Sequence, residues 1–152
     1  LQFASSGYKE KTENFSLTKL IESIIKKYEN KNISHQLIQD IHMNGRKSLI
    51  QRCINNLIDN SIKYGNKINI QLSSNNNILV LTIDDDGPGI PTNEYDNVFK
   101  PFYKINKSRG DSKSSVGLGL SIASDIVRSH GGNIILDKSP LDGLRVKIIF
   151  PS

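Results

Sequence analysis

Residues 47–64 read KSLIQRCINNLIDNSIKY, and this stretch has the apolar spacing of an amphipathic α-helix. The helix is expected to end at Gly65-Asn66, a pair typical of a helix C-terminus. At 100° per residue, its polar and apolar residues fall on opposite sides. The polar side holds Arg52, Asn56, Asp59, Asn60 and Lys63, and the apolar side holds Ile50, Cys53, Ile54, Leu57, Ile58 and Tyr64.

Two asparagines on the polar side, Asn56 and Asn60, lie one helical turn apart. Their carboxamide oxygens are hard, neutral ligands, which suits Mg²⁺ that arrives bound to phosphates because a neutral ligand does not repel those phosphates. A solvated face opposite a core stripe explains the same pattern. On this helix alone, both interpretations stay open.

The patterns on either side of this helix predict an α/β fold, specifically a two-layer sandwich. Antiparallel strand pairs with few helices indicate a mixed, mostly antiparallel sheet covered on one face by about three helices. Residues 1–15 are expected to be the end of an upstream element and a linker, and residues 16–152 to form the folded domain. Besides 47–64, the predicted elements are a helix from Leu17 after the N-cap Ser16, a weak strand over 35–42, a hairpin of strands 67–72 and 78–83, a helix over 117–130, and final strands over 133–138 and 144–150.

Length and composition restrict the classes of protein that remain. A chain of 152 residues fits one domain, and its charge of +5 is spread along the sequence, so an anionic ligand explains the charge as well as nucleic acid does. Cys53 is the only cysteine, which excludes an intrachain disulfide and a cysteine-based zinc site. No apolar run reaches the ~18 residues of a membrane-spanning helix.

A second candidate for function is DDDGPGI at residues 84–90, directly after an apolar strand. Adjacent carboxylates are costly unless each is solvated or given a partner. A turn of Asp, Gly and Pro at a strand end is the simpler explanation. Alternatively, one carboxylate accepts a hydrogen bond from the exocyclic amine of a base, and the glycines leave room for the flat ring.

A third candidate is GLGL at residues 117–120, which opens a helix after a basic loop. Glycine at a helix N-terminus lets backbone N–H groups approach a phosphate, although a packing or capping role is equally compatible. The lysines and arginines of the loop are either phosphate ligands or solvated charges. A metal-ligand pair, a base-binding carboxylate, a basic loop and a glycine-rich helix start together indicate a Mg-nucleotide site.

These motifs resemble those of the catalytic, ATP-binding domain of sensor histidine kinases, a member of the GHKL superfamily with the Bergerat fold. The family's N box is similar to residues 56–64, its G1 box to 85–90, its F box to 99–104 and its G2 box to 117–122. The order and spacing of the four boxes are those of the family, over about residues 16–151. Residues 63–66 with the later DDGPGI resemble most the osmosensor (EnvZ-like) branch.

The resemblance implies ATP and Mg²⁺ as cofactors and assigns roles to the motif residues. Asn60 would hold Mg²⁺, Asn56 would lie beside the phosphates, and Lys104 would act with them in catalysis. Asp85 would accept the hydrogen bond of the adenine amine. Residues 103–116 would form a lid over the nucleotide. Further nucleotide contacts would come from Lys63, Tyr64, Gly87, Gly89, Ile90, Phe102, Lys104, Arg109, Gly117, Leu118, Gly119 and Leu120.

The family transfers the γ-phosphate to a histidine followed by an acidic residue, on a dimerisation hairpin upstream. Here His35 precedes Gln36, His42 precedes Met43 and His130 precedes Gly131, so each is expected to be a surface or edge histidine. The implied partners are therefore the chain's own upstream dimerisation and phosphoacceptor domain and a response regulator. The resemblance further implies a cytoplasmic domain of a homodimeric bacterial inner-membrane protein, with no contact between this fragment and membrane or nucleic acid.

Two other functions are alternatives to the kinase. Other GHKL ATPases carry Glu at the position of Asn56 to activate water, and Asn cannot serve as that base. A nucleotide-binding interaction module without transfer activity would be expected to lack Asn60 or Asp85, and both are present.

Overall fold

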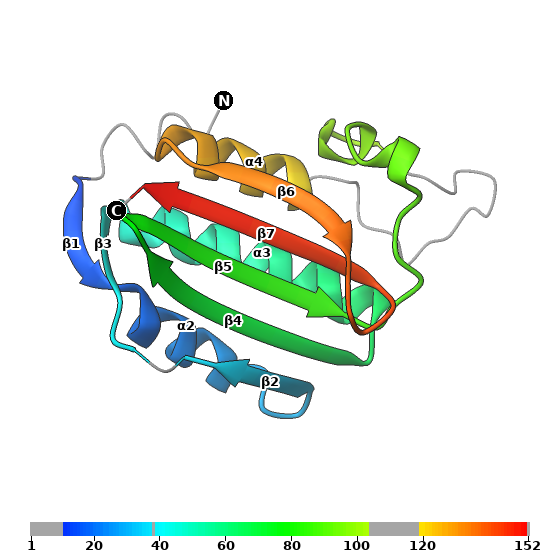
Figure 1. The fold of residues 1–152 in the computed structure, drawn as a ribbon, viewed down its shortest axis with the longest axis horizontal. Coiled ribbons are helices and arrows are strands. Elements are labelled where there is room, and N and C mark those ends of the chain that lie inside the picture. Colours follow the sequence, from blue (N-terminus) through cyan, green and yellow to red (C-terminus); the bar gives the residue numbers. More distant parts are fainter. Residues whose placement is uncertain (1–10, 38, 104–118, 152) are drawn as a thin grey trace.

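The computed structural model describes residues 11–37, 39–103 and 119–151, which form two layers. One layer is a five-stranded sheet, and three helices cover one of its faces (Figure 1). Only the edge pair β2–β4 is parallel; the other three neighbouring pairs are antiparallel. The predicted two-layer sandwich is therefore confirmed. Across the sheet the strands are β2 (Asn32–Gln36), β4 (Lys67–Asn75), β5 (Ile78–Asp85), β7 (Leu144–Pro151) and β6 (Asn133–Lys138), and the helices are α2 (Leu17–Lys26), α3 (Lys47–Tyr64) and α4 (Gly119–Ser129).

The helix boundaries follow the capping signals of the sequence. Ser16 is the N-cap of α2, and its Oγ accepts the N–H of Lys19 at 3.1 Å. The helix α3 ends at Tyr64, where the N–H of Gly65 donates to the carbonyl of Ser61 at 2.8 Å. Two short 3₁₀ turns, η1 (Thr92–Glu94) and η2 (Asn97–Phe99), follow the C-terminal end of β5 in the chain.

The prediction of one strand over 35–42 was wrong. The structure has two strands that overlap only its ends: the edge strand β2 ends at Gln36 and β3 (His42–Gly45) begins at His42. The strand β3 pairs with β1 (Glu13–Ser16) in a separate two-stranded ribbon. Between β2 and β3 the chain turns toward the start of α2. There the carbonyl of Ile41 accepts the N–H of Leu17 at 2.8 Å, and the N–H of Ile41 donates to Thr18 Oγ1 at 2.9 Å. The strand β1 was also missed, because its sequence is polar apart from Phe15.

The hairpin β4–β5 is longer than predicted. Its strands pair as far as Asn75 and Ile78, so only Asn76 and Asn77 form the loop. Both have positive φ, 50° and 66°, as a two-residue hairpin turn of the type favoured by Asn requires.

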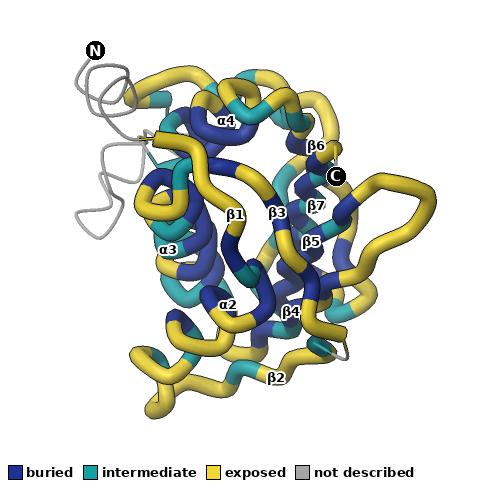
Figure 2. Tube along the Cα trace, turned by 90° about the vertical axis from the view of Figure 1, so that its left-hand side faces the viewer, coloured by how far each residue is buried: buried dark blue, intermediate teal, exposed yellow. Residues whose placement is uncertain are grey.

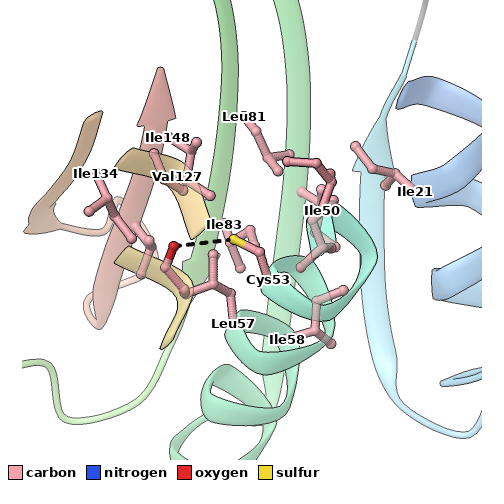
Figure 3. Close-up of a cluster of buried hydrophobic side chains, with 14 of the residues drawn as sticks. Ile21, Ile50, Cys53, Leu57, Ile58, Leu81, Ile83, Val127, Ile134 and Ile148 are labelled. Carbon is pink, nitrogen blue, oxygen red and sulfur yellow. Dashed lines mark hydrogen bonds between the residues drawn. The ribbon is translucent and has the colours of Figure 1, made fainter. Parts of the chain in front are cut away.

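The core lies between the helices and the facing side of the sheet (Figure 2). Residues of β5 and β7 alternate between this inner face and an outer face that no helix of the described residues covers. Cys53 is buried in the core, with Sγ 3.7 Å from the carbonyl of Ala123 on α4 (Figure 3). Around it lie Ile50, Leu57, Leu81, Ile83, Val127, Ile134 and Ile148.

Candidate functional site

The polar side of α3 forms one wall of the candidate site. Three of its side chains are half-buried: Asn56, Asn60 and Lys63. The opposite, apolar side of the helix is buried in the core. Asp59, on the polar side, is exposed and accepts a hydrogen bond from the hydroxyl of Tyr28 at 2.7 Å. This bond joins the turn after α2 to the helix that carries both asparagines.

The three consecutive aspartates at the end of β5 each have a partner of their own. Asp84 faces the outer side of the sheet, is 1 % exposed, and pairs with Arg145 of β7. Asp86 accepts the N–H groups of Asn66 and Lys67 at 2.7 and 2.9 Å, and these hydrogen bonds lower its pKa. The expectation that adjacent carboxylates need partners is confirmed, because alternation along the strand separates them.

Asp85 faces the helices and is 3 % exposed. Its Oδ1 accepts the N–H groups of Gly87 at 2.9 Å and Leu144 at 3.1 Å. Burial raises the pKa of Asp85, although both backbone hydrogen bonds act in the opposite direction. The result is a carboxylate with one oxygen fixed by two backbone groups, at the sheet end beside the C-terminus of α3 (Figure 1).

The glycines around Asp85 are needed by the backbone itself. A Cβ on Gly87 would lie 2.6 Å from the carbonyl oxygen of Tyr64, and Gly89 has φ +73°. A Cβ on Gly143, in the β6–β7 turn, would lie 2.2 Å from Asp85 Oδ1. Gly143, like Leu144, was not among the predicted site residues. It lies between the two predicted final strands, and nothing local in the sequence indicates its contact with Asp85.

Gly119 differs from these glycines because the space beside it is open. Among the described residues, the only heavy atom within 4 Å of a Cβ built there is the carbonyl oxygen of Asn56, at 3.9 Å. The first residue of α4 therefore lies beside the backbone of α3 at Asn56. The following Leu120 is buried and contributes its side chain to the core.

The remaining predicted site residues lie at the end of α3, in or after the turn of the G1 box (the G1 turn, residues 85–90), or outside the described residues. Ile90 is half-buried against the core, Tyr64 is 49 % exposed, and Lys63 Nζ lies 5.6 Å from the centroid of the Tyr64 ring. Phe102 is 65 % exposed and has φ +65°. Lys104, Arg109, Gly117 and Leu118, and most of the predicted lid over 103–116, lie outside the described residues.

One carboxylate, that of Glu94 at the end of η1, makes hydrogen bonds to the segment that leads to Tyr103. Glu94 accepts hydrogen bonds from the Tyr103 hydroxyl and from Asn97 Nδ2, the latter at 2.9 Å. These bonds lower the pKa of Glu94 and fix the segment that connects the G1 turn to residue 103.

Residues 45–152 match the family model of histidine kinase-, DNA gyrase B- and HSP90-like ATPases. The chain belongs to this family. Within it, the catalytic, ATP-binding domains of sensor histidine kinases are its relatives, and it is a domain of that kind. Sensor histidine kinase GtrS of Pseudomonas aeruginosa is 38 % identical over 107 residues, which cover 70 % of this chain and 22 % of GtrS. CpxA of Escherichia coli is 31 % identical over 108 residues, covering 70 % of this chain and 24 % of CpxA. The chain thus spans about a quarter of the length of these relatives.

Solved structures show the same fold at lower identity. The catalytic domain of histidine kinase ThkA superposes with a TM-score of 0.81 at 22 % identity, covering 93 % of this chain and 95 % of that one. The mycobacterial sensor histidine kinase MprB gives 0.78 at 24 % identity, with 93 % and 97 % covered. The α/β fold of this histidine kinase catalytic domain is therefore that of known catalytic domains.

Two further observations concern metal binding and membrane-spanning helices. In the part of the chain that the structure describes, no three His, Cys, Asp or Glu side chains are grouped as a metal site. Within the same residues, no helix has the length and apolar character needed to span a bilayer.

Proposed function

We propose that this histidine kinase catalytic domain binds Mg-ATP between α3, the G1 turn and the start of α4. It transfers the γ-phosphoryl group to a histidine on a dimerisation and phosphoacceptor domain, from which a response regulator receives it. The observation that carries this proposal is Asp85, a buried carboxylate held by two backbone N–H groups next to Gly65, the residue that ends the asparagine-bearing helix α3.

The residues divide into a base end and a phosphate end. Asp85 would accept the hydrogen bond of the adenine amine, because an ionised carboxylate only accepts hydrogen bonds and the amine of the base donates them. Asn56, Asn60 and the N-terminus of α4 would face the phosphates, where glycine leaves backbone N–H groups accessible. Lys63, Tyr64, Gly87, Gly89, Ile90 and Phe102 are proposed as further contacts, together with Lys104, Arg109, Gly117, Leu118 and Leu120.

Asn60 is the residue that we propose to hold Mg²⁺. The donor set fits an ion that brings its own phosphate ligands, since Asn60 adds one hard, neutral oxygen without repelling them. When bound, the ion would neutralise charge on the phosphates. The chain's own part is to position the triphosphate and to exclude water from it.

Phosphoryl transfer fits the site better than hydrolysis does. The position next to the phosphates is Asn56, whose carboxamide cannot act as a general base toward water. Of the three histidines, none is followed by an acidic residue. We therefore propose that the acceptor histidine is on a separate domain. The parent protein is proposed to be a homodimeric inner-membrane sensor with a cytoplasmic catalytic domain. The resemblance of residues 63–66 and 85–90 further favours the osmosensor branch.

Calorimetry with a non-hydrolysable ATP analogue, with and without Mg²⁺, tests the binding step. We expect binding that strengthens with Mg²⁺ and weakens in Asp85→Asn. The matched control is Asp142→Asn, an exposed residue in the neighbouring turn whose φ of 81° is also accessible to Asn. No measurable binding at millimolar analogue would overturn the proposal. Mixing the domain with the separately expressed hairpin of its parent should then yield acid-labile phosphohistidine.

A further inference from the structure

We propose that Arg145, on the face of the sheet opposite the nucleotide site, is a positioning residue for base recognition by Asp85. Through its ion pair with Asp84, it fixes the start of β7, which holds the Asp85 carboxylate. This inference rests on the proposed function, because it takes Asp85 to be the residue that reads adenine.

The ion pair is a two-point contact on a buried carboxylate. Arg145 Nε donates to Asp84 Oδ1 at 2.8 Å, and Nη2 donates to Oδ2 at 3.0 Å. The Asp84 side chain is 1 % exposed and the Arg145 side chain 31 % exposed. Two parallel N–H···O bonds fix orientation as well as distance. Losing the arginine would leave a buried charge without compensation, which is strongly unfavourable.

The same two strands make a second contact one residue further along, on the inner face. Asp84 and Arg145 are register partners across β5 and β7. The next residue of each strand toward the turn, Asp85 and Leu144, are joined by the hydrogen bond from the Leu144 N–H to Asp85 Oδ1. The outer ion pair and the inner hydrogen bond therefore lie back to back across one step of the ladder.

The fit around Asp85 leaves little freedom. The N–H of Gly143 donates to the Asp85 carbonyl at 3.1 Å, and even a Cβ on Gly143 would lie 2.2 Å from Asp85 Oδ1. If the start of β7 shifts, this carboxylate loses the Leu144 N–H, one of its two backbone donors. Gly87, its other donor, belongs to the segment after β5 rather than to β7.

The pair is also separate from the core. It lines a cavity of about 330 Å³ on the outer face, bounded by the β2 and β4 side chains and by Pro140 and Leu141 of the β6–β7 turn. Changing Arg145 therefore removes no apolar side chain from the helix–sheet interface. The residues proposed for the triphosphate lie on α3 and α4, so the loss of Arg145 should affect selection of the base more than binding of the phosphates.

The test measures base selectivity, defined as the Kd of an inosine triphosphate analogue divided by that of the matching adenosine analogue. In Arg145→Gln we expect this ratio to fall by about tenfold. In Arg145→Lys, which keeps the charge but not the two-point geometry, the fall should be smaller. Lys147→Gln is the matched control, because Lys147 is the next outward residue of β7 and faces Thr82 rather than a carboxylate. Its ratio should stay within about twofold of the wild type.

Amide hydrogen exchange adds a direct readout of position. Arg145→Gln should speed exchange at the Leu144 N–H while exchange at Ile148, in the middle of β7, stays unchanged. If Arg145→Gln does not fold, the double variant Asp84→Asn, Arg145→Gln removes both charges together and gives the same two measurements. Unchanged selectivity and unchanged Leu144 exchange would overturn the positioning role. If Asp85→Asn leaves selectivity unchanged, the assignment of Asp85 to adenine fails instead.

Discussion

His130 Nε2 accepts the backbone N–H of Arg46 at 3.0 Å, so the residue after α4 is joined to the residue before α3. Its Nδ1 lies 2.8 Å from the carbonyl oxygen of Ile126. Because a carbonyl oxygen can only accept, Nδ1 carries the proton and Nε2 offers its lone pair. The ring also packs edge-on against Phe150, with centroids 6.3 Å apart. His130 thus links the two helices whose other ends we propose to lie at the nucleotide site.

Replacing His130 with Phe should destabilise the domain by about 1–3 kcal/mol, because the ring is kept but the N–H of Arg46 loses its acceptor. Urea unfolding followed by circular dichroism measures this change. His35→Phe is the control, since His35 is exposed on the edge strand β2 and should stay within about 0.5 kcal/mol. Equal effects of the two substitutions would contradict a linking role for His130.

Asp85→Asn should raise the stability of the nucleotide-free domain while weakening ATP binding. Burial raises the pKa of Asp85, so the folded state binds more protons than the unfolded state between the ordinary value of 3.8 and the raised value. Across that window, wild-type stability falls as the pH rises, and above it the full cost of ionisation remains. Asn retains an oxygen for the N–H groups of Gly87 and Leu144 without this cost.

Urea midpoints of wild type and Asp85→Asn, measured at pH values from 3.5 to 8, provide the check. The advantage of the variant should be largest at neutral pH and shrink as the pH falls toward 3.8, because Asp85 becomes protonated first in the folded state and then in the unfolded state. A variant that is less stable than the wild type at pH 7 would show that the two hydrogen bonds need the charge.

The parts of the fold that could be predicted from sequence are those marked by local features such as apolar periodicity and capping residues. The helix α3 has both a strong apolar period and a Gly65 stop, and its boundaries match the predicted 47–64. The strand prediction for 35–42 failed because the backbone of Ile41 bonds to the start of α2 rather than to a neighbouring strand. Such a contact depends on tertiary packing, as the bond between Ile41 and Leu17 shows.

The same distinction applies to the site. Asn56, Asn60 and Asp85 belong to contiguous motifs, so they could be proposed from the sequence. Asp84 and Arg145 are 61 residues apart in the sequence, and only the pairing of β5 with β7 brings them together. The same holds for Asp85 and its neighbours Gly143 and Leu144. No local pattern marks a glycine whose neighbour is a carboxylate on another strand.

Cys53 should resist thiol reagents in the native state. Burial in the α3–α4 interface raises the pKa of its thiol to about 12, so the reactive thiolate is scarce at pH 8 and the sulfur is shielded from solvent. Labelling by a disulfide reagent should therefore follow the urea unfolding curve. Rapid labelling in buffer, at the rate of the fully unfolded chain, would contradict this burial.

Gly119→Ala should separate folding from nucleotide binding. A Cβ at this position meets, among the described residues, only the carbonyl of Asn56 at 3.9 Å, an ordinary contact. Alanine also favours a helix over glycine by up to about 1 kcal/mol. The melting temperature should therefore stay the same or rise. If backbone N–H groups at the start of α4 approach a phosphate, the added methyl group should weaken binding of the ATP analogue by about tenfold or more.

Asp125→Ala is the matched control for Gly119→Ala, because it adds alanine to an exposed position of the same helix, away from the site. It removes a negative charge, so any general electrostatic effect would strengthen binding of an anion rather than weaken it. Calorimetry and thermal melts on both variants give the comparison. If Gly119→Ala binds as tightly as Asp125→Ala, the space beside Gly119 is not where the phosphates lie, and the start of α4 is needed only to pack Leu120 into the core.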